Sequence, residues 1–86
     1  SAAKHYNLGV AYGEKGQHDL AIKEYQEALR LKPDFVEAHD TLAEAYKGQG
    51  QYDLAIRHAE HALRIKPDLK ETRELLDELY RLRGKQ

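Results

Sequence analysis

The sequence contains no cysteine, methionine or tryptophan, and it has only two prolines among its 86 residues. Without cysteine, there can be no disulfide bridge, thiolate metal site or cysteine nucleophile. No apolar run approaches the roughly 20 residues that a membrane-spanning helix requires, and Ser1–Lys4 shows no signal-peptide pattern. We therefore expect a soluble protein with no membrane partner, and a cytoplasmic location is favoured over a secreted one.

An excess of charge of one sign is also lacking. The 14 lysines and arginines nearly balance 15 aspartates and glutamates, and the formal net charge is −1. A nucleic-acid partner is therefore not expected, because nucleic-acid binders usually carry a basic surface. No catalytic triad order, phosphate-binding glycine loop or nucleotide fingerprint is present. We predict no enzymatic activity, no catalytic residue and no cofactor.

Histidine is the one residue type that suggests a metal. His58 and His61 are three residues apart, which would place two imidazoles on one side of a helix. No third ligand is brought near them by its spacing in the sequence, and a zinc site needs three or four ligands. We therefore predict that the protein binds no metal.

An internal repeat with a period of 34 residues organises the chain. Between positions 5 and 34, sixteen of the 30 residues recur after this shift, including the runs Asp19–Ile22 and Asp53–Ile56. A third copy is incomplete and continues only through Leu76, Tyr80 and Gly84. Fixed periods of this length are typical of stacked repeat proteins, so the chain contains about two and a half units.

Each unit reads as two helices. Apolar residues recur at helical spacing, Gly16 and Gly50 end the first helix of each unit, and Pro33 and Pro67 end the second. The following aspartates, Asp34 and Asp68, are predicted N-caps, and Glu37 and Glu71 would complete capping boxes. Short links make consecutive helices antiparallel. The pattern predicts helices over residues 3–15, 18–31, 35–48, 52–65 and 69–83.

Alternating small and large residues predict how these hairpins close. Alanines recur at matched positions of both helices, and Tyr12, Tyr25, Tyr46 and Tyr80 are the large residues expected to fill the core between them. Tyr6 is the tyrosine expected to be free for a ligand. Such a hairpin buries its apolar face only by stacking on the next unit, so an all-α stack is predicted.

The sequence resembles the tetratricopeptide repeat family over essentially its whole length. The first unit carries the family pattern of a leucine, a small residue and a tyrosine, followed by alanine, an aromatic residue, alanine and proline. In the second unit, Ala59 replaces the aromatic residue. The resemblance implies one all-α domain (1–86), a right-handed αα-hairpin solenoid of five antiparallel helices. Its units would be repeats 2–35 and 36–69, with a partial third repeat or C-terminal capping helix over 70–86.

The resemblance also implies a non-catalytic scaffold or adaptor that binds a protein or peptide on the concave surface formed by the first helix of each unit. The positions that match this surface include six carboxylates but only two cations, for a net charge of −4 on a chain of −1. An acidic groove favours a ligand with basic residues. The family's carboxylate clamp, in contrast, is not predicted, because Tyr6, Val10, Thr41, Glu71 and Leu75 occupy its positions. The predicted contacts are Tyr6, Asn7, Val10, Glu37, Asp40, Thr41, Glu44, Glu74 and Glu78.

The last predicted helix has apolar residues on more than one side. Leu75, Leu79 and Leu82 form a stripe at helical spacing in addition to Leu76 and Tyr80. This stripe fits either a terminal cap whose leucines fold over the open end or a self-association surface, which would make a homodimer. A self-associating fragment, or an engineered repeat scaffold with no dedicated ligand, is thus the alternative to a peptide-binding module.

Overall fold

Five α-helices and no strand make up the computed structural model, which describes residues 1–86. Every predicted helix is present, and no end differs from the prediction by more than one residue. The bounds are α1 (Ala2–Glu14), α2 (His18–Leu31), α3 (Val36–Gly48), α4 (Tyr52–Ile65) and α5 (Lys70–Gly84).

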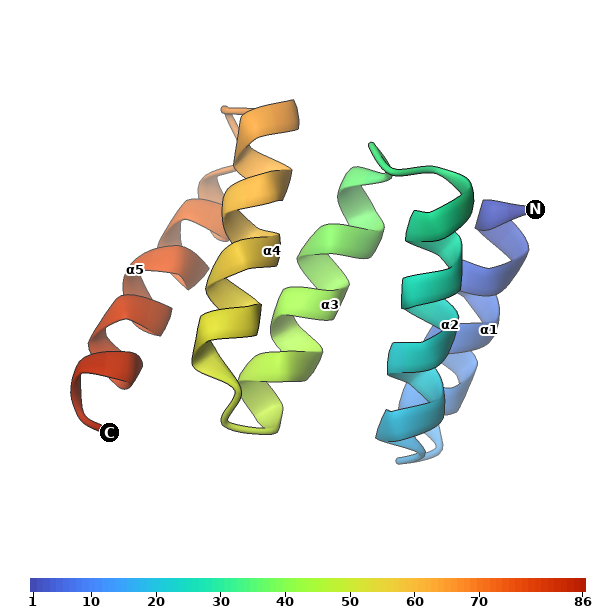
Figure 1. Cartoon of the computed structure of the whole chain (residues 1–86), viewed down its shortest axis with the longest axis horizontal. Coiled ribbons are helices and arrows are strands. Elements are labelled where there is room, and N and C mark those ends of the chain that lie inside the picture. Colours follow the sequence, from blue (N-terminus) through green and yellow to red (C-terminus); the bar gives the residue numbers. More distant parts are fainter.

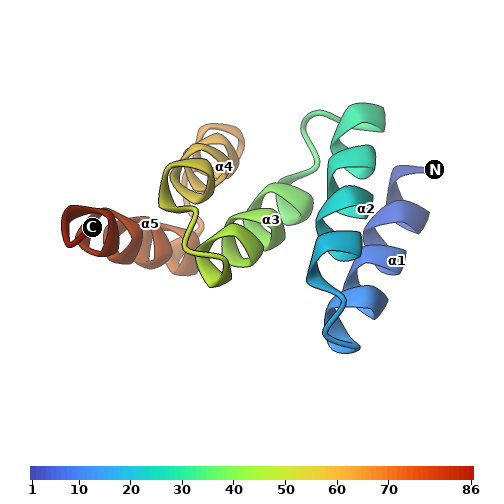
Figure 2. The same cartoon turned by 60° about the horizontal axis from the view of Figure 1, so that its bottom comes forward.

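The helices run antiparallel in chain order across a molecule of 35 × 27 × 18 Å (Figure 1). Each helix packs chiefly against its neighbours in the sequence, so the chain is an all-α repeat solenoid, as predicted. The helices α2 and α4 lie toward one side and α1, α3 and α5 toward the other (Figure 2). None of the five combines the length and the apolar content that crossing a membrane requires.

The two turns inside the repeats depend on glycine. Gly16 and Gly50 have φ values of 79° and 73°, in the left-handed region that other residues rarely adopt. The next residue in each case, Gln17 or Gln51, donates its backbone N–H to a carbonyl five residues earlier, at 2.9 Å. This is the Schellman arrangement, which satisfies the last carbonyls of a helix and reverses the chain.

The predicted N-caps of α3 and α5 are wrong. Phe35 and Leu69 occupy the cap positions, and neither helix has a side-chain cap hydrogen bond. Asp34 and Asp68 each lie one residue too early, because the turn after each proline is one residue longer than we expected. Phe35 instead packs its ring 5.2 Å from the ring of Tyr6, so a hydrophobic contact stands where a polar cap was predicted.

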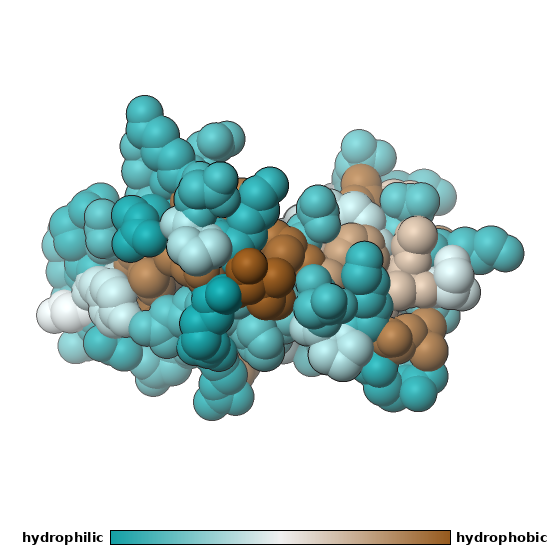
Figure 3. Space-filling model, turned by 90° about the horizontal axis from the view of Figure 1, so that it is seen from above, coloured by the Kyte–Doolittle hydropathy of each residue, from teal (hydrophilic) through white to brown (hydrophobic).

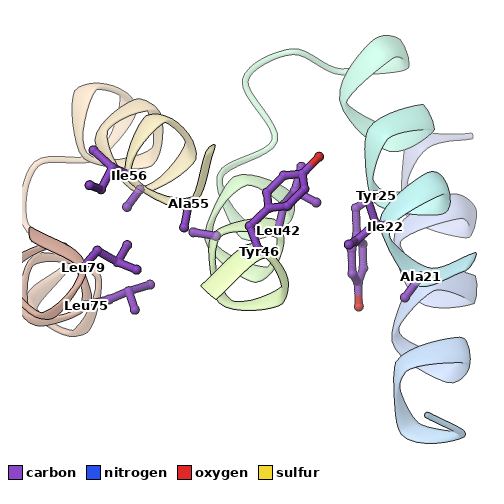
Figure 4. Packing of buried hydrophobic residues seen from close by; sticks show 11 residues of the cluster. Ala21, Ile22, Tyr25, Leu42, Tyr46, Ala55, Ile56, Leu75 and Leu79 are labelled. Atoms are coloured by element: carbon purple, nitrogen blue, oxygen red, sulfur yellow. The ribbon is translucent and has the colours of Figure 1, made fainter. Parts of the chain in front are cut away.

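The core shows a compensation in side-chain size between the two repeats (Figure 4). In the first repeat, Tyr25 lies against Gly9, and a Cβ atom built on Gly9 would be only 2.6 Å from the tyrosine ring. In the second repeat, the equivalent positions hold Ala43 and Ala59, both fully buried. The second repeat thus has a smaller residue than Tyr25 at position 59, and it compensates with Ala43, which is larger than the equivalent Gly9, on the facing helix.

The fifth helix buries residues other than those predicted for the core. Leu75 and Leu79 are buried with Thr72, whereas Tyr80, predicted to be a core residue, is 40% exposed. Figure 4 shows the two leucines pointing from α5 toward α4, where Ile56 belongs to the same cluster. Leu75 and Leu79 stand where the second repeat has Thr41 and Ala45, and the longer side chains bury more apolar surface in the core.

We predict that Gly9→Ala destabilises the protein by about 1–3 kcal/mol, because the buried tyrosine ring must move to admit the methyl group. The matched control is Gly48→Ala, whose added Cβ would meet nothing within 4 Å. That control should be neutral or stabilising by up to about 1 kcal/mol, since alanine favours helix. Urea unfolding followed by circular dichroism measures both, and equal stabilities of the two variants would contradict the packing argument.

Candidate functional site

Three side-chain bridges join α1, α3 and α5, the helices that carry the predicted ligand contacts. The hydroxyls of Tyr6 and Thr41 are 3.1 Å apart, and Thr72 donates to Asp40 at 2.8 Å. Lys47 donates to the Glu78 carboxylate at 2.8 Å. We call the surface formed by the predicted contact residues of these helices the α1–α3–α5 face. Each of the three bridges that connect its helices includes at least one residue of the face.

Tyr6 is less free than we expected. Its ring lies 5.7 Å from that of Tyr25 as well as beside Phe35, and the residue is half-buried. Val10 is also half-buried and packs against the core, whereas Asn7 is exposed. The α1 end of the face therefore offers an amide and the edges of two apolar side chains.

The carboxylates of the face fall into two groups. Asp40 and Glu78 are half-buried and take part in the bridges to Thr72 and Lys47. The hydrogen bond to Glu78 raises the pKa of the Lys47 ammonium, so this ammonium stays charged near neutral pH. The remaining carboxylates are exposed and take part in no ion pair; they are Glu37, Glu44, Glu71 and Glu74.

Two surface hollows adjoin these carboxylates. The smaller one, about 250 Å³, lies between α3 and the start of α5, where Asp40, Asp68 and Glu71 line it beside Lys70. The larger one, about 450 Å³, lies between the α1–α2 turn and the last turns of α3. Glu44 lines the larger hollow rather than the smaller one, so the structure does not bring all predicted carboxylates together in a single pocket.

Most of the leucine stripe of α5 is buried. Leu75 is 7% exposed and Leu79 is fully buried, while only Leu82 is half-buried near the end of the helix. Two of the three residues of the stripe are therefore buried within this chain.

A histidine cluster that the sequence did not predict lies between α3 and α4. His39 stacks on His61, with ring centroids 4.1 Å apart, and its Nδ1 is 3.1 Å from His58 Nδ1. The Pro33 carbonyl, 2.8 Å from His39 Nε2, can only accept a hydrogen, so this nitrogen carries one. In the neutral ring, Nδ1 of His39 then accepts from His58.

Position within the repeat explains the cluster. The first repeat has a His5–Glu24 contact of 2.8 Å, and the positions equivalent to these two residues are His39 and His58. Since His5 contacts Glu24 in the first repeat, the equivalent positions in the second repeat indicate a contact between His39 and His58. The spacing within α4 alone pointed instead to His58 and His61 as the pair to consider.

Known proteins were compared with the chain by sequence and by structure. A family model described as TPR repeat matches residues 11–50, and one described as Tetratricopeptide repeat matches residues 36–69. Over 37 residues, the chain is 38% identical to the "Tetratricopeptide repeat and J domain-containing co-chaperone DNJ1" of Cryptococcus neoformans var. grubii. That segment is 43% of this chain and 7% of the co-chaperone.

Solved structures agree with this assignment. MamA superposes with a TM-score of 0.95 at 28% identity, covering 98% of this chain and 46% of that one. A chain of the APC/C hetero-tetramer Cut9–Hcn1 matches with a TM-score of 0.86 at 31% identity, over 91% of this chain and 15% of that one. The first TPR of Spaghetti (RPAP3), bound to the HSP90 peptide SRMEEVD, shares the fold at 18% identity, with a TM-score of 0.88 over 98% of this chain and 68% of that one.

The chain belongs to the tetratricopeptide repeat family, as its repeat pattern predicted. It spans less than half the length of MamA and a small fraction of the co-chaperone. Members of this family are protein-interaction modules and are generally non-catalytic. In this chain, the three bridges connect the helices that carry the predicted ligand contacts.

We predict that acid destabilises the protein through His58. Burial, followed by the nearby histidines and Arg57, lowers the pKa of His58 from 6.5 to about 4, and burial also lowers the pKa of His39. Between pH 6.5 and about pH 4, the unfolded chain therefore binds more protons than the folded chain does. The free energy of unfolding therefore falls as the pH drops from about 6.5 to 4, by about 1–2 kcal/mol after allowing for partial exposure.

The variant His58→Gln should show a weaker decrease over this pH range, because it lacks the titrating group. The matched control, His18→Gln, changes an exposed histidine outside the cluster and should keep the wild-type pH dependence. Urea unfolding at a series of pH values measures all three proteins. Identical slopes for wild type and His58→Gln would remove the cluster as the cause.

Proposed function

We propose that this chain is a non-catalytic adaptor whose α1–α3–α5 face binds a Lys- and Arg-rich peptide segment of a partner protein. The observation that carries the proposal is the set of exposed carboxylates, Glu37, Glu44, Glu71 and Glu74, which take part in no ion pair. Exposed charges on one face attract a ligand of opposite charge, increase its association rate and disfavour acidic competitors.

The face supports such binding because it is rigid before the ligand arrives. The bridges from Tyr6 to Thr41, Asp40 to Thr72 and Lys47 to Glu78 hold three helices together without using the exposed carboxylates. A preorganised surface loses little conformational entropy on binding, so the peptide alone bears most of the ordering cost. An extended or a helical segment would then lie across the helices.

The two ends of the face favour different ligand residues. Asn7 and the edges of Tyr6 and Val10 offer one amide and apolar contacts at the α1 end. The hollow beside Asp40, Asp68 and Glu71 offers carboxylates to a Lys or Arg side chain at the α5 end. The expected ligand therefore has a polar or apolar residue toward one end and basic residues toward the other.

The ligand proposed here is opposite in charge to the peptide that is bound in one of the structures with the same fold. The peptide SRMEEVD, bound to the first TPR of RPAP3, contains three acidic residues. On this chain, Glu71 and Leu75 occupy positions where the family's clamp needs cationic donors, and a carboxylate there would repel a carboxylate ligand. We therefore expect an acidic peptide of this kind to bind poorly.

The test compares fluorescein-labelled peptides by fluorescence anisotropy, one rich in Lys and Arg and one of equal length rich in Asp and Glu. The basic peptide should bind at least about tenfold more tightly at low salt, and added salt should reduce this difference. The double variant Glu37→Gln/Glu74→Gln should weaken binding of the basic peptide about tenfold, because both substitutions remove an exposed charge from the face.

The matched control is Glu14→Gln/Asp34→Asn, which changes the net charge equally at exposed residues that lie outside the face and take part in no ion pair. It should alter affinity by less than about twofold. Equal binding of the acidic peptide, or an equal loss from the control pair, would contradict the proposal.

A further inference from the structure

The outer side of α4 carries cations that no carboxylate of this chain neutralises. Arg57 and Arg64 are exposed and take part in no ion pair, and the half-buried His61 lies between them in the sequence. Spacings of four and three residues place all three on one side of the helix. We call these three residues the α4 stripe.

The corresponding positions of α2 are partly neutralised within that helix. After the 34-residue shift they are Lys23, Glu27 and Arg30, and Glu27 accepts hydrogen bonds from the guanidinium of Arg30. In α4, His61 replaces the glutamate, and its ring stacks on the ring of His39 instead. The unpaired charge of the α4 stripe is therefore specific to the second repeat.

The acidic residues of α4 have partners other than the stripe. Asp53 pairs with Arg83 of α5 at 3.2 Å, and Glu60 accepts a hydrogen bond from the Tyr80 hydroxyl. The two arginines thus give the stripe a formal charge of +2 that no ion pair within the chain balances.

The α4 stripe and the acidic face belong to opposite sides of the molecule. Figure 2 shows α2 and α4 toward one side and α1, α3 and α5, which carry the face, toward the other. One chain cannot bring its own stripe onto its own face. Only another molecule can neutralise either surface, and a second copy of this chain carries both.

The spacing of the charges also matches between the two surfaces. Glu37 and Glu44 on α3 are seven residues apart, as are Arg57 and Arg64 on α4. Seven residues make about two turns of a helix, or about 10.5 Å along its axis. A helix that lies along α3, in either direction, can therefore place both arginines opposite both glutamates.

We propose that the α1–α3–α5 face binds α4 of a second copy of this chain, with Arg57 and Arg64 opposite Glu37 and Glu44. The inference rests on the proposed function, because it names α4 as the basic segment that the face binds. The exposed carboxylates of α5, which lies beside α3, add negative charge next to the docked helix. The separation of the α3 carboxylates into different places suits a ligand whose two cations are equally separated.

Charge rather than apolar area brings the copies together. Hydrophilic residues cover most of the surface in view in Figure 3, and the exposed positions of the outer side of α4 are charged. The formal net charge of −1 leaves little repulsion between copies. The contact joins two different surfaces, so each bound copy still has one face or one stripe free. Such an assembly grows open-ended unless its rotation closes a ring.

The test is sedimentation velocity on the whole 86-residue chain. In low salt, the weight-average mass should rise at least about twofold between about 10 μM and 1 mM protein, because exposed ion pairs give weak association. Salt at about 0.5 M should return the protein to the monomer. A monomer over the whole concentration range in low salt would overturn the inference.

Charge reversal identifies the surfaces involved. Arg57→Glu/Arg64→Glu and Glu37→Arg/Glu44→Arg should each be monomeric, because each places like charges opposite one another. The fourfold variant that combines them has the net charge of the wild type and should associate again, since a reversed stripe fits a reversed face. A fourfold variant that is folded by circular dichroism but monomeric would contradict the pairing.

The matched control for net charge is Lys23→Glu/Lys85→Glu. It alters the charge as much as the stripe variant does, at exposed residues that take part in no ion pair and lie outside both surfaces. It should therefore keep most of the association. A loss equal to that of Arg57→Glu/Arg64→Glu would assign the effect to general repulsion and overturn the inference.

A Lys- and Arg-rich peptide separates this inference from the proposed function. At concentrations that saturate the face, the peptide should dissociate the assembly, because it competes with α4 for the same carboxylates. A protein that binds the peptide but is always monomeric would overturn the self-association alone. A protein that binds no basic peptide would contradict the proposed function as well.

Discussion

Close approach of the two helices within each repeat sets the geometry of the whole stack. Gly9 lets the ring of Tyr25 lie directly on the α1 backbone, and the Ala43–Ala59 pair achieves a similar approach with two small side chains. Interhelical distance depends on the side chains at the contact, so the sum of the two sizes matters more than either residue. Once each hairpin is closed, its neighbours can stack with side chains in register, and the bridges between α1, α3 and α5 can form.

These bridges divide the polar side chains of the face into two roles. One role is to hold the helices together, through the hydrogen bonds from Thr72 to Asp40 and from Lys47 to Glu78. The exposed carboxylates contribute little to stability because solvent screens their charges. Residues that stability does not require are free to be selected for recognition. The separation of the two roles is what allows one repeat framework to present different ligand-binding surfaces.

Much of the fold could be predicted because its determinants are local and repeated. Gly16 and Gly50 identify the turns, and the 34-residue period identifies the equivalent core positions. Burial within α5 was harder to predict, because Leu75, Leu76, Leu79 and Tyr80 are all large and apolar, and the way in which α5 lies on α4 decides how deeply each is buried. The N-caps were predicted wrongly for a related reason. Whether Asp34 or Phe35 is the N-cap of α3 depends on the contact between Phe35 and Tyr6.

The candidate face could be predicted only as a set of positions. Equivalent positions in the repeats predict which residues belong to it, but the direction of each side chain depends on partners from other helices. The half-burial of Tyr6 beside Thr41 and the place of Glu44 in a separate hollow are results of such contacts.

Because each helix packs chiefly on the helices next to it in the sequence, the contacts between helices join segments that are neighbours along the chain. Bringing such residues together requires the closure of short loops only, which favours rapid folding. The same arrangement means that α5 can detach without breaking any contact of α1 with α2, since no structural element connects the two ends. Amide hydrogen exchange in such a chain is expected to be graded, fastest at the terminal helices and slowest in α3 and α4.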